Sequence, residues 1–251
     1  METKQNEIIN DLLGYEGLKI IQRPDVFNFS LDSTILADFV TLKEKDSKVI
    51  DLGCGNGYIP IFLTLRTNAS IYGVEIQEEI YDLAIRSVKL NNLEDKITIM
   101  NGDIKKIHEK LGTSTFDVVV SNPPYFKYEP NSNINKNDYL TIARHEVKVT
   151  LDEVLKCANI LLKDRGTFAM VHRSDRLLEI LETFRKYKIE PKRIRFVYAK
   201  TNSKESVAVL IEGKKACKPG GLKVLDPLYV QNSDGSYTEE ILKIFNYKKD
   251  E

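Results

Sequence analysis

Short apolar segments alternate with amphipathic ones along most of the chain from residue 49 onward. Short apolar runs are typical of strands, and hydrophobic residues repeated every three to four positions are typical of helices. The segments that predict strands are residues 49–53, 70–75, 97–100, 116–121, 166–172, 193–199 and 205–211. The segments that predict helices are residues 33–40, 58–66, 78–91, 151–163 and 174–187. Strands separated by helices predict an α/β fold with a mostly parallel sheet and helices on both faces.

Two segments indicate the middle and the end of this sheet. Residues 116–121, FDVVVS, are too apolar for a half-exposed strand, so we expect this strand inside the sheet. Only residues 201–204 connect the last two predicted strands. Because parallel strands need a longer crossover, this pair is predicted to form an antiparallel hairpin. Residues 131–137 are rich in asparagine and predict a flexible loop.

The composition excludes several classes of protein. Hydrophobic residues make up 42% of the 251 residues, which is typical of a globular chain. No apolar run approaches the roughly 18 residues that a membrane span needs, so we expect no membrane association. Three scattered cysteines and three histidines have neither disulfide nor ligand spacing, so no metal is expected. The polar N-terminus lacks the apolar region of a signal peptide, which predicts a cytoplasmic protein, and nothing indicates the oligomeric state.

The charge is balanced overall but not along the chain. The formal net charge is zero, whereas residues 163–223 contain 16 Lys and Arg against 7 Asp and Glu. A basic third on a neutral protein suggests a local surface for a polyanion. The alternative is a set of solvated helix and loop faces.

A glycine-rich turn follows the first predicted strand. Residues 51–57, DLGCGNG, open a helix, and Gly53 and Gly55 allow a tight turn that a ligand can approach closely. Dinucleotide enzymes use similar turns, so the glycines alone are weak evidence. Asp51 begins the motif and Glu75 ends the next strand, where a carboxylate can accept hydrogen bonds from both ribose hydroxyls.

A third acid, Asp103, follows the strand predicted at residues 97–100. At that edge its carboxylate can accept a hydrogen bond from an adenine amino group, or it can cap a helix over residues 104–110. Acids after three successive strands favour a nucleoside site at the carboxyl edge of the sheet.

The tetrapeptide Asn122-Pro123-Pro124-Tyr125 ends the fourth predicted strand. The lone pair of an exocyclic adenine nitrogen is delocalised into the ring, and two acceptors for its protons can draw it out of conjugation. The amide oxygen of Asn122 and the carbonyl of Pro123 can be those acceptors, and consecutive prolines fix the carbonyl direction. Tyr125 offers a flat face for stacking a base. The alternative is a plain strand-ending turn.

With these motifs the chain resembles the class I S-adenosylmethionine (SAM)-dependent methyltransferases over roughly residues 45–212. The resemblance implies a Rossmann-like, seven-stranded, mostly parallel sheet that ends in the antiparallel hairpin. It also implies SAM as cofactor, with Asp51, Gly53, Gly55 and Asn122 at its site, Glu75 on the ribose and Asp103 on the adenine. Weaker candidates for that site are Asn56, Gln77 and Ile104.

Residues 122–125 resemble motif IV of the N6-adenine methyltransferases and of enzymes that methylate a glutamine side-chain amide. Both targets present a planar NH2 group, so the motif does not separate them. Residues 27–39, 142–146 and 221–241 resemble the bacterial family that methylates the adenine 3′ of the anticodon in a valine tRNA. This implies tRNA as the substrate, Phe29 and Asp32 near the cofactor, and Arg144 or His145 at the substrate. A surface ion pair is the alternative for Arg144.

A tRNA substrate gives the basic third a role. We expect phosphate contacts from a set of five basic side chains: Lys192, Arg193, Arg195, Lys214 and Lys215. The loop at residues 131–137 is a candidate lid over a base flipped out beside Tyr125.

Several alternatives stay open. They are a protein-glutamine N5-methyltransferase, a non-catalytic RNA-binding protein with a methyltransferase fold, and a nicotinamide dehydrogenase. Glutamine methyltransferases of release factors typically carry a helical domain before the catalytic one, and only about 45 residues precede the first strand here. We therefore predict an N-terminal extension at residues 1–45, a methyltransferase domain at 46–215 and a tail at 216–251.

Overall fold

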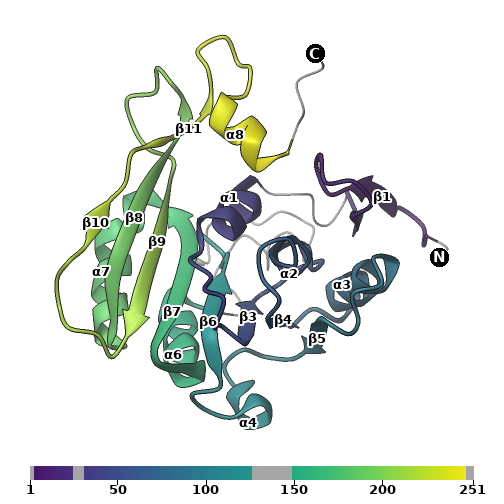
Figure 1. Cartoon of the computed structure of the whole chain (residues 1–251), viewed down its shortest axis with the longest axis horizontal. Helices are drawn as coiled ribbons and strands as arrows, with labels where there is room; N and C mark the ends of the chain where they lie inside the picture. The colour runs from purple at the N-terminus through teal and green to yellow at the C-terminus, as the bar shows by residue number, and fades with distance from the viewer. Residues whose placement is uncertain (1–2, 25–30, 126–148, 247–251) are drawn as a thin grey trace, which may run out of the picture.

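The computed structural model describes residues 3–24, 31–125 and 149–246. Its main sheet has nine strands in the order β10-β8-β9-β7-β6-β3-β4-β5, and β11 also pairs with β8 (Figure 1). The strands in chain order are β3 (Lys48–Leu52), β4 (Ser70–Glu75), β5 (Ile97–Asn101), β6 (Phe116–Ser121), β7 (Leu162–Arg173), β8 (Ile189–Lys200), β9 (Ala208–Lys215), β10 (Lys223–Val224) and β11 (Leu228–Gln231).

The pairing confirms the predicted topology for the seven strands β3 to β9, whereas β10 and β11 are two further strands, of two and four residues, that were not predicted. Strands β5, β4, β3, β6 and β7 run parallel, and β9 is antiparallel to both β7 and β8. The predicted strand at residues 116–121 is β6, and it lies inside the sheet between β3 and β7. Val118 and Val120 pack into the core on one face while Val119 packs into the core on the other. Burial on both faces explains why this strand is apolar without alternation.

Helices cover both faces of the sheet (Figure 1). Helices α1 (Leu31–Phe39), α2 (Tyr58–Leu63), α3 (Glu78–Leu90) and α8 (Glu239–Ile244) contribute to one core. The other core contains residues from α6 (Leu151–Leu161) and α7 (Leu177–Lys186). It also contains Ile104 and Ile107, which lie in the turn before α4 (His108–Leu111). Thr150 and Glu153 form a capping box that starts α6. Among the described residues, none of the helices has the length and apolar content needed to cross a bilayer.

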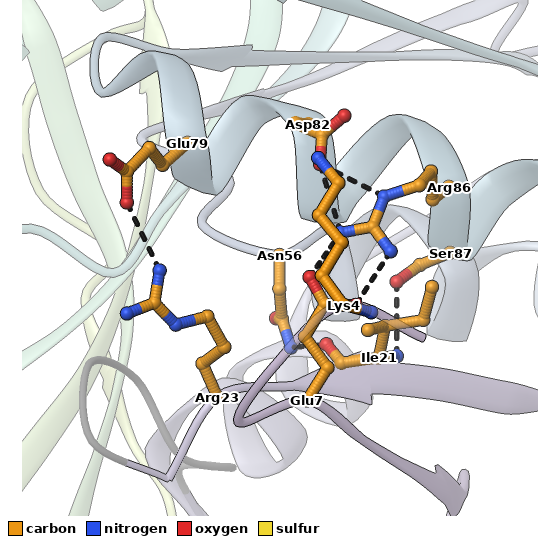
Figure 2. Close-up of polar contacts among 9 residues, drawn as sticks. All are labelled: Lys4, Glu7, Ile21, Arg23, Asn56, Glu79, Asp82, Arg86 and Ser87. Atoms are coloured by element: carbon orange, nitrogen blue, oxygen red, sulfur yellow. Dashed lines mark hydrogen bonds and ion pairs between the residues drawn. The ribbon is translucent and has the colours of Figure 1, made fainter. Parts of the chain in front are cut away.

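An N-terminal hairpin of β1 (Ile8–Asp11) and β2 (Lys19–Gln22) was not predicted. Its strands have only four residues each, and an isolated two-stranded hairpin is marginally stable. Figure 2 shows the polar contacts that fasten it to α3 and to the glycine-rich turn. These contacts join Glu7 and Lys4 to the Arg86–Asp82 pair, Arg23 to Glu79, Ile21 to Ser87, and Asn56 to Ile21.

Asn56 is the link between the hairpin and the turn. Its side chain is 2% exposed, and its Nδ2 donates to the carbonyl of Ile21 at 3.0 Å (Figure 2). This hydrogen bond therefore ties the glycine-rich turn to strand β2 of the N-terminal hairpin.

Candidate functional site

The strands β3, β4, β5 and β6 end at one edge of the sheet, because parallel neighbours share a direction. The glycine-rich turn, Glu75, Asp103 and the Asn-Pro-Pro-Tyr segment all follow these strand ends. The structure thus places the predicted motifs along a single edge.

The glycine-rich turn is held against β4. The backbone N–H groups of Gly53 and Cys54 donate to the carbonyl of Val74 at 2.9 and 3.0 Å. Gly53 and Gly55 have φ of +79° and +55°, values that non-glycine residues rarely adopt. A Cβ built on Gly53 meets no atom within 4 Å, so the backbone there is open to close approach by a ligand.

Two buried carboxylates lie beside this turn. Glu75 is 6% exposed, and it accepts hydrogen bonds from the backbone N–H of Gly55 at 3.1 Å and of Gln77 at 2.9 Å. Asp51 is fully buried, and neither of its oxygens has a partner among the described residues. Burial raises the pKa of both carboxyls, and the charge of Glu75 raises the pKa of Asp51 further. Buried oxygens without partners are typical of a ligand site.

The remaining cofactor candidates lie at the next strand end. Asp103 is half-buried, and its Oδ1 accepts from the backbone N–H of Lys105 at 2.9 Å. The helix expected over residues 104–110 is limited to α4, whose N-cap is Ile107, so the side chain of Asp103 caps the turn before α4 rather than a helix. Ile104 is buried in the core, and Oε1 of Gln77 is buried without a partner among the described residues.

The Asn-Pro-Pro-Tyr segment lies against the first turn of α1. Nδ2 of Asn122 donates to Oγ of Ser33 at 3.0 Å. The hydroxyl of Tyr125 lies 2.7 Å from Oδ1 of Asn122 and 2.8 Å from Oδ2 of Asp32. Burial raises the pKa of Asp32, against the hydrogen bond from Tyr125, and burial also raises the pKa of the phenol.

Two residues that carry no motif complete the site around Tyr125. The ring of His172 lies 5.2 Å from the tyrosine ring, centroid to centroid. Nη1 of Arg176 donates to the backbone carbonyl of Tyr125 at 3.0 Å. Ser33, His172 and Arg176 were missed because only the tertiary fold brings them to the tetrapeptide.

A family model described as a methyltransferase domain matches residues 43–238. The chain belongs to this methyltransferase family. Two relatives are named tRNA1(Val) (adenine(37)-N6)-methyltransferase. The protein of Porphyromonas gingivalis is 28% identical over 200 residues, which are 78% of this chain and 76% of that protein. The protein of Flavobacterium psychrophilum is 21% identical over 237 residues, 93% of this chain and 97% of that protein.

Solved structures agree with the predicted fold of this methyltransferase. A predicted O-methyltransferase from Agrobacterium tumefaciens superposes with a TM-score of 0.68 at 18% identity, covering 86% of this chain and 96% of that one. M. jannaschii TYW2 in complex with AdoMet superposes with a TM-score of 0.57 at 17% identity, covering 85% and 88%. The predicted Rossmann-like sheet with its antiparallel hairpin is confirmed.

Most of the basic side chains that are expected on phosphates also have partners within the methyltransferase. Four of the five side chains expected on phosphates make hydrogen bonds or ion pairs within the protein: Lys192 to the carbonyls of Lys218 and Gly220, Arg193 to Glu212, Arg195 to Glu240, and Lys215 to the carbonyls of Asn159 and Leu162. They fasten the β8–β9 end of the sheet to its surroundings, so a count of charges overestimates the free basic surface.

Some predictions lie outside the described residues. These are Phe29, the lid at residues 131–137, Arg144 and His145. Within the described ranges, His, Cys, Asp and Glu side chains do not gather in groups of three or more at which a metal could bind.

We expect His172 to make the stability of the methyltransferase depend on pH. It is fully buried, and its Nδ1 accepts from the backbone N–H of Arg173 at 2.8 Å. Burial, with the charge of Arg176, lowers the pKa of His172 from 6.5 to about 4. As the pH falls below 6.5 the unfolded chain binds a proton that the folded chain takes up only near 4. Stability present above pH 6.5 is therefore lost toward pH 4, by about 3 kcal/mol.

We expect His172→Phe, which keeps an aromatic ring beside Tyr125, to remove this loss. Urea unfolding at several pH values between 7 and 4 measures the effect, as a flatter fall of the unfolding free energy in the variant. The other buried acids are the same in the wild type and in the variant, so their contributions cancel when the two unfolding free energies are subtracted. Parallel curves would show that His172 titrates normally in the fold.

Proposed function

We propose that this chain transfers a methyl group from SAM to the N6 amino group of an adenine in tRNA, in the cytoplasm. The proposal rests on the position of Asn122 and Pro123. They follow the carboxyl end of β6, at the same edge of the sheet as the glycine-rich turn and Glu75. The relatives in Porphyromonas gingivalis and Flavobacterium psychrophilum are named for adenine 37 of tRNA1(Val), and we extend that target to this chain.

The residues at this edge fit SAM, which supplies a methyl group on a positively charged sulfur. The open backbone at Gly53 leaves room for the methionine part, with Gly55 beside it. Glu75 already accepts two backbone hydrogen bonds, and a carboxylate has further lone pairs for the ribose hydroxyls. The partnerless oxygens of Asp51 suit a positively charged or hydrogen-bond-donating ligand, and Asp103 suits the adenine.

The target amino group needs acceptors rather than a nucleophile from the protein. Oδ1 of Asn122 accepts from Tyr125, and a carbonyl oxygen has a second lone pair for an N6 proton. The carbonyl of Pro123, fixed by the following Pro124, accepts the other proton. Transfer then depends on position and on preorganised dipoles. Water takes the proton that the methylated amine loses.

The names of the relatives favour an adenine over a glutamine target. The N-terminal residues bear on the domain boundaries. Their described part forms a short hairpin and helix α1, and both pack on the catalytic sheet and its helices. We therefore propose that residues 1–45 complete the domain of residues 46–215. The described part of the predicted tail, up to residue 246, adds β10 and β11 to the edge of the same sheet and α8 to one core.

The test uses methyl-labelled SAM with two separate pools, tRNA and soluble protein, from cells that lack this chain. Label in tRNA, followed by mapping of N6-methyladenine in the valine tRNA, supports the proposal. A valine tRNA transcript with guanine in place of the adenine 3′ of the anticodon should accept no label. Label in a protein glutamine would contradict the proposal, and so would the absence of label from both pools.

A further inference from the structure

Helix α1 brings two polar side chains from the N-terminal extension to the Asn-Pro-Pro-Tyr segment. Ser33 contacts Asn122 and Asp32 contacts Tyr125, across separations of 89 and 93 residues. Ser33 is 7% exposed, so water does not compete freely for its hydroxyl. The segment is therefore held from one side by its own strand β6 and from the other by α1.

Helix α1 is a rigid support for these contacts. The hydroxyl of Thr34 donates to the hydroxyl of Tyr58 in α2 at 3.0 Å, and Thr34 and Leu36 are fully buried. At the other end, the guanidinium of Arg66 donates to the carbonyl of Val40 at 3.0 Å. A helix fixed at both ends places its first turn within narrow limits, which is what preorganised catalytic groups need.

The contact with Ser33 anchors the Asn122 amide in the orientation of the structure, with Nδ2 on Ser33 and Oδ1 facing Tyr125. Rotating this amide by half a turn exchanges a donor for an acceptor, and only the orientation with its oxygen toward the substrate can accept an amino proton. With Nδ2 on Oγ of Ser33, the oxygen lies on the opposite side, where Tyr125 now donates to it. Losing the Ser33 hydroxyl removes one of the two partners that hold the amide, the other being the Tyr125 hydroxyl.

Asp32 gives the Tyr125 hydroxyl a second acceptor. The hydroxyl has one proton and lies within 2.8 Å of both Oδ2 of Asp32 and Oδ1 of Asn122. When a substrate amino group donates to Asn122, the hydroxyl can donate to Asp32 instead. No group in this set then loses its hydrogen bond as the base enters.

We propose that Ser33 is a positioning residue for methyl transfer, which anchors the Asn122 side chain so that its amide oxygen can accept from the target nitrogen, while Asp32 accepts from the Tyr125 hydroxyl. The inference deepens the proposed function and rests on it for the identity of the base. It applies equally to a glutamine amide, since that group also has two protons on a planar nitrogen.

The test compares Ser33→Ala with Thr34→Val, a matched loss of a buried hydroxyl on the same helix that does not contact the tetrapeptide. Rates are measured with the full chain on whichever pool, tRNA or protein, the wild type labels. Ser33→Ala should lower kcat by about 10- to 100-fold, with KM for the substrate and Kd for SAM within about twofold of wild type. Thr34→Val should leave kcat within about threefold while lowering the melting temperature.

Ser33→Cys, which keeps the volume of the side chain but accepts hydrogen bonds weakly, should show a similar loss of kcat and guards against misfolding of the alanine variant. A wild-type kcat in either Ser33 variant would overturn the positioning role, as would an equal loss in Thr34→Val. Both results leave the proposed function standing if the wild type labels tRNA. A wild type that labels neither pool overturns the function and the positioning role together.

Discussion

Replacing Asn122 with alanine is expected to lower the rate of methyl transfer by about 100- to 1,000-fold while SAM still binds. The amide oxygen is one of two acceptors that orient the target nitrogen, and an alanine leaves one N–H without a partner in the reacting geometry. Glu75 and the glycine-rich turn lie on neighbouring strands and keep their contacts in this variant. The loss should therefore appear in kcat, with Kd for SAM within about threefold of wild type.

Single-turnover transfer to tRNA and calorimetric SAM binding measure the two quantities on the same preparation. Asn232→Ala is the control, because this asparagine bonds within the C-terminal turn, to Ser236, and is outside the site. If the Asn122 variant methylates tRNA at the wild-type rate, Asn122 does not orient the target amino group and the proposed chemistry is wrong. A variant that fails to bind SAM would instead place Asn122 at the cofactor.

The strands of the central sheet were predictable because their hydrophobic pattern is local. Residues 116–121 are β6 to the residue, since every position but Asp117 is buried by neighbours on both faces. The N-terminal hairpin was not predictable in this way. Its stability depends on partners such as Arg86 and Ser87, which lie more than 60 positions away along the chain. No pattern within four-residue strands carries that information.

The same distinction between local pattern and long-range contact applies to the site. Its motif residues, such as Asp51 and Glu75, follow strands, so the topology of a parallel sheet was enough to predict a common edge. Ser33 lies in the segment 27–39 but was given no role, and His172 carries no motif. Both were found only through their contacts with Asn122 and Tyr125. Charge counts along the sequence also lack this information about contacts. They register a basic side chain such as Lys215 but not the carbonyls it bonds inside the protein.

Glu75→Gln is expected to weaken SAM binding by about 10- to 100-fold. The carboxylate accepts from Gly55 and Gln77 and has lone pairs left for the ribose hydroxyls. An amide of the same shape turns one acceptor into a donor, so either a backbone N–H or a ribose hydroxyl loses its partner. The side chain is buried, and water cannot fully replace that partner.

Thermal unfolding with and without SAM shows the effect through mass action. At a SAM concentration of about 100 times the wild-type Kd, binding stabilises the wild type by about 2.7 kcal/mol, and a variant with 100-fold weaker binding by only about 0.4 kcal/mol. Glu78→Gln is the matched control, since Glu78 lies three residues after Glu75 and its side chain is exposed. Equal SAM-dependent shifts in the Glu75 and Glu78 variants would mean that the cofactor does not use this carboxylate. In that case the buried acid serves only to hold the glycine-rich turn against α3.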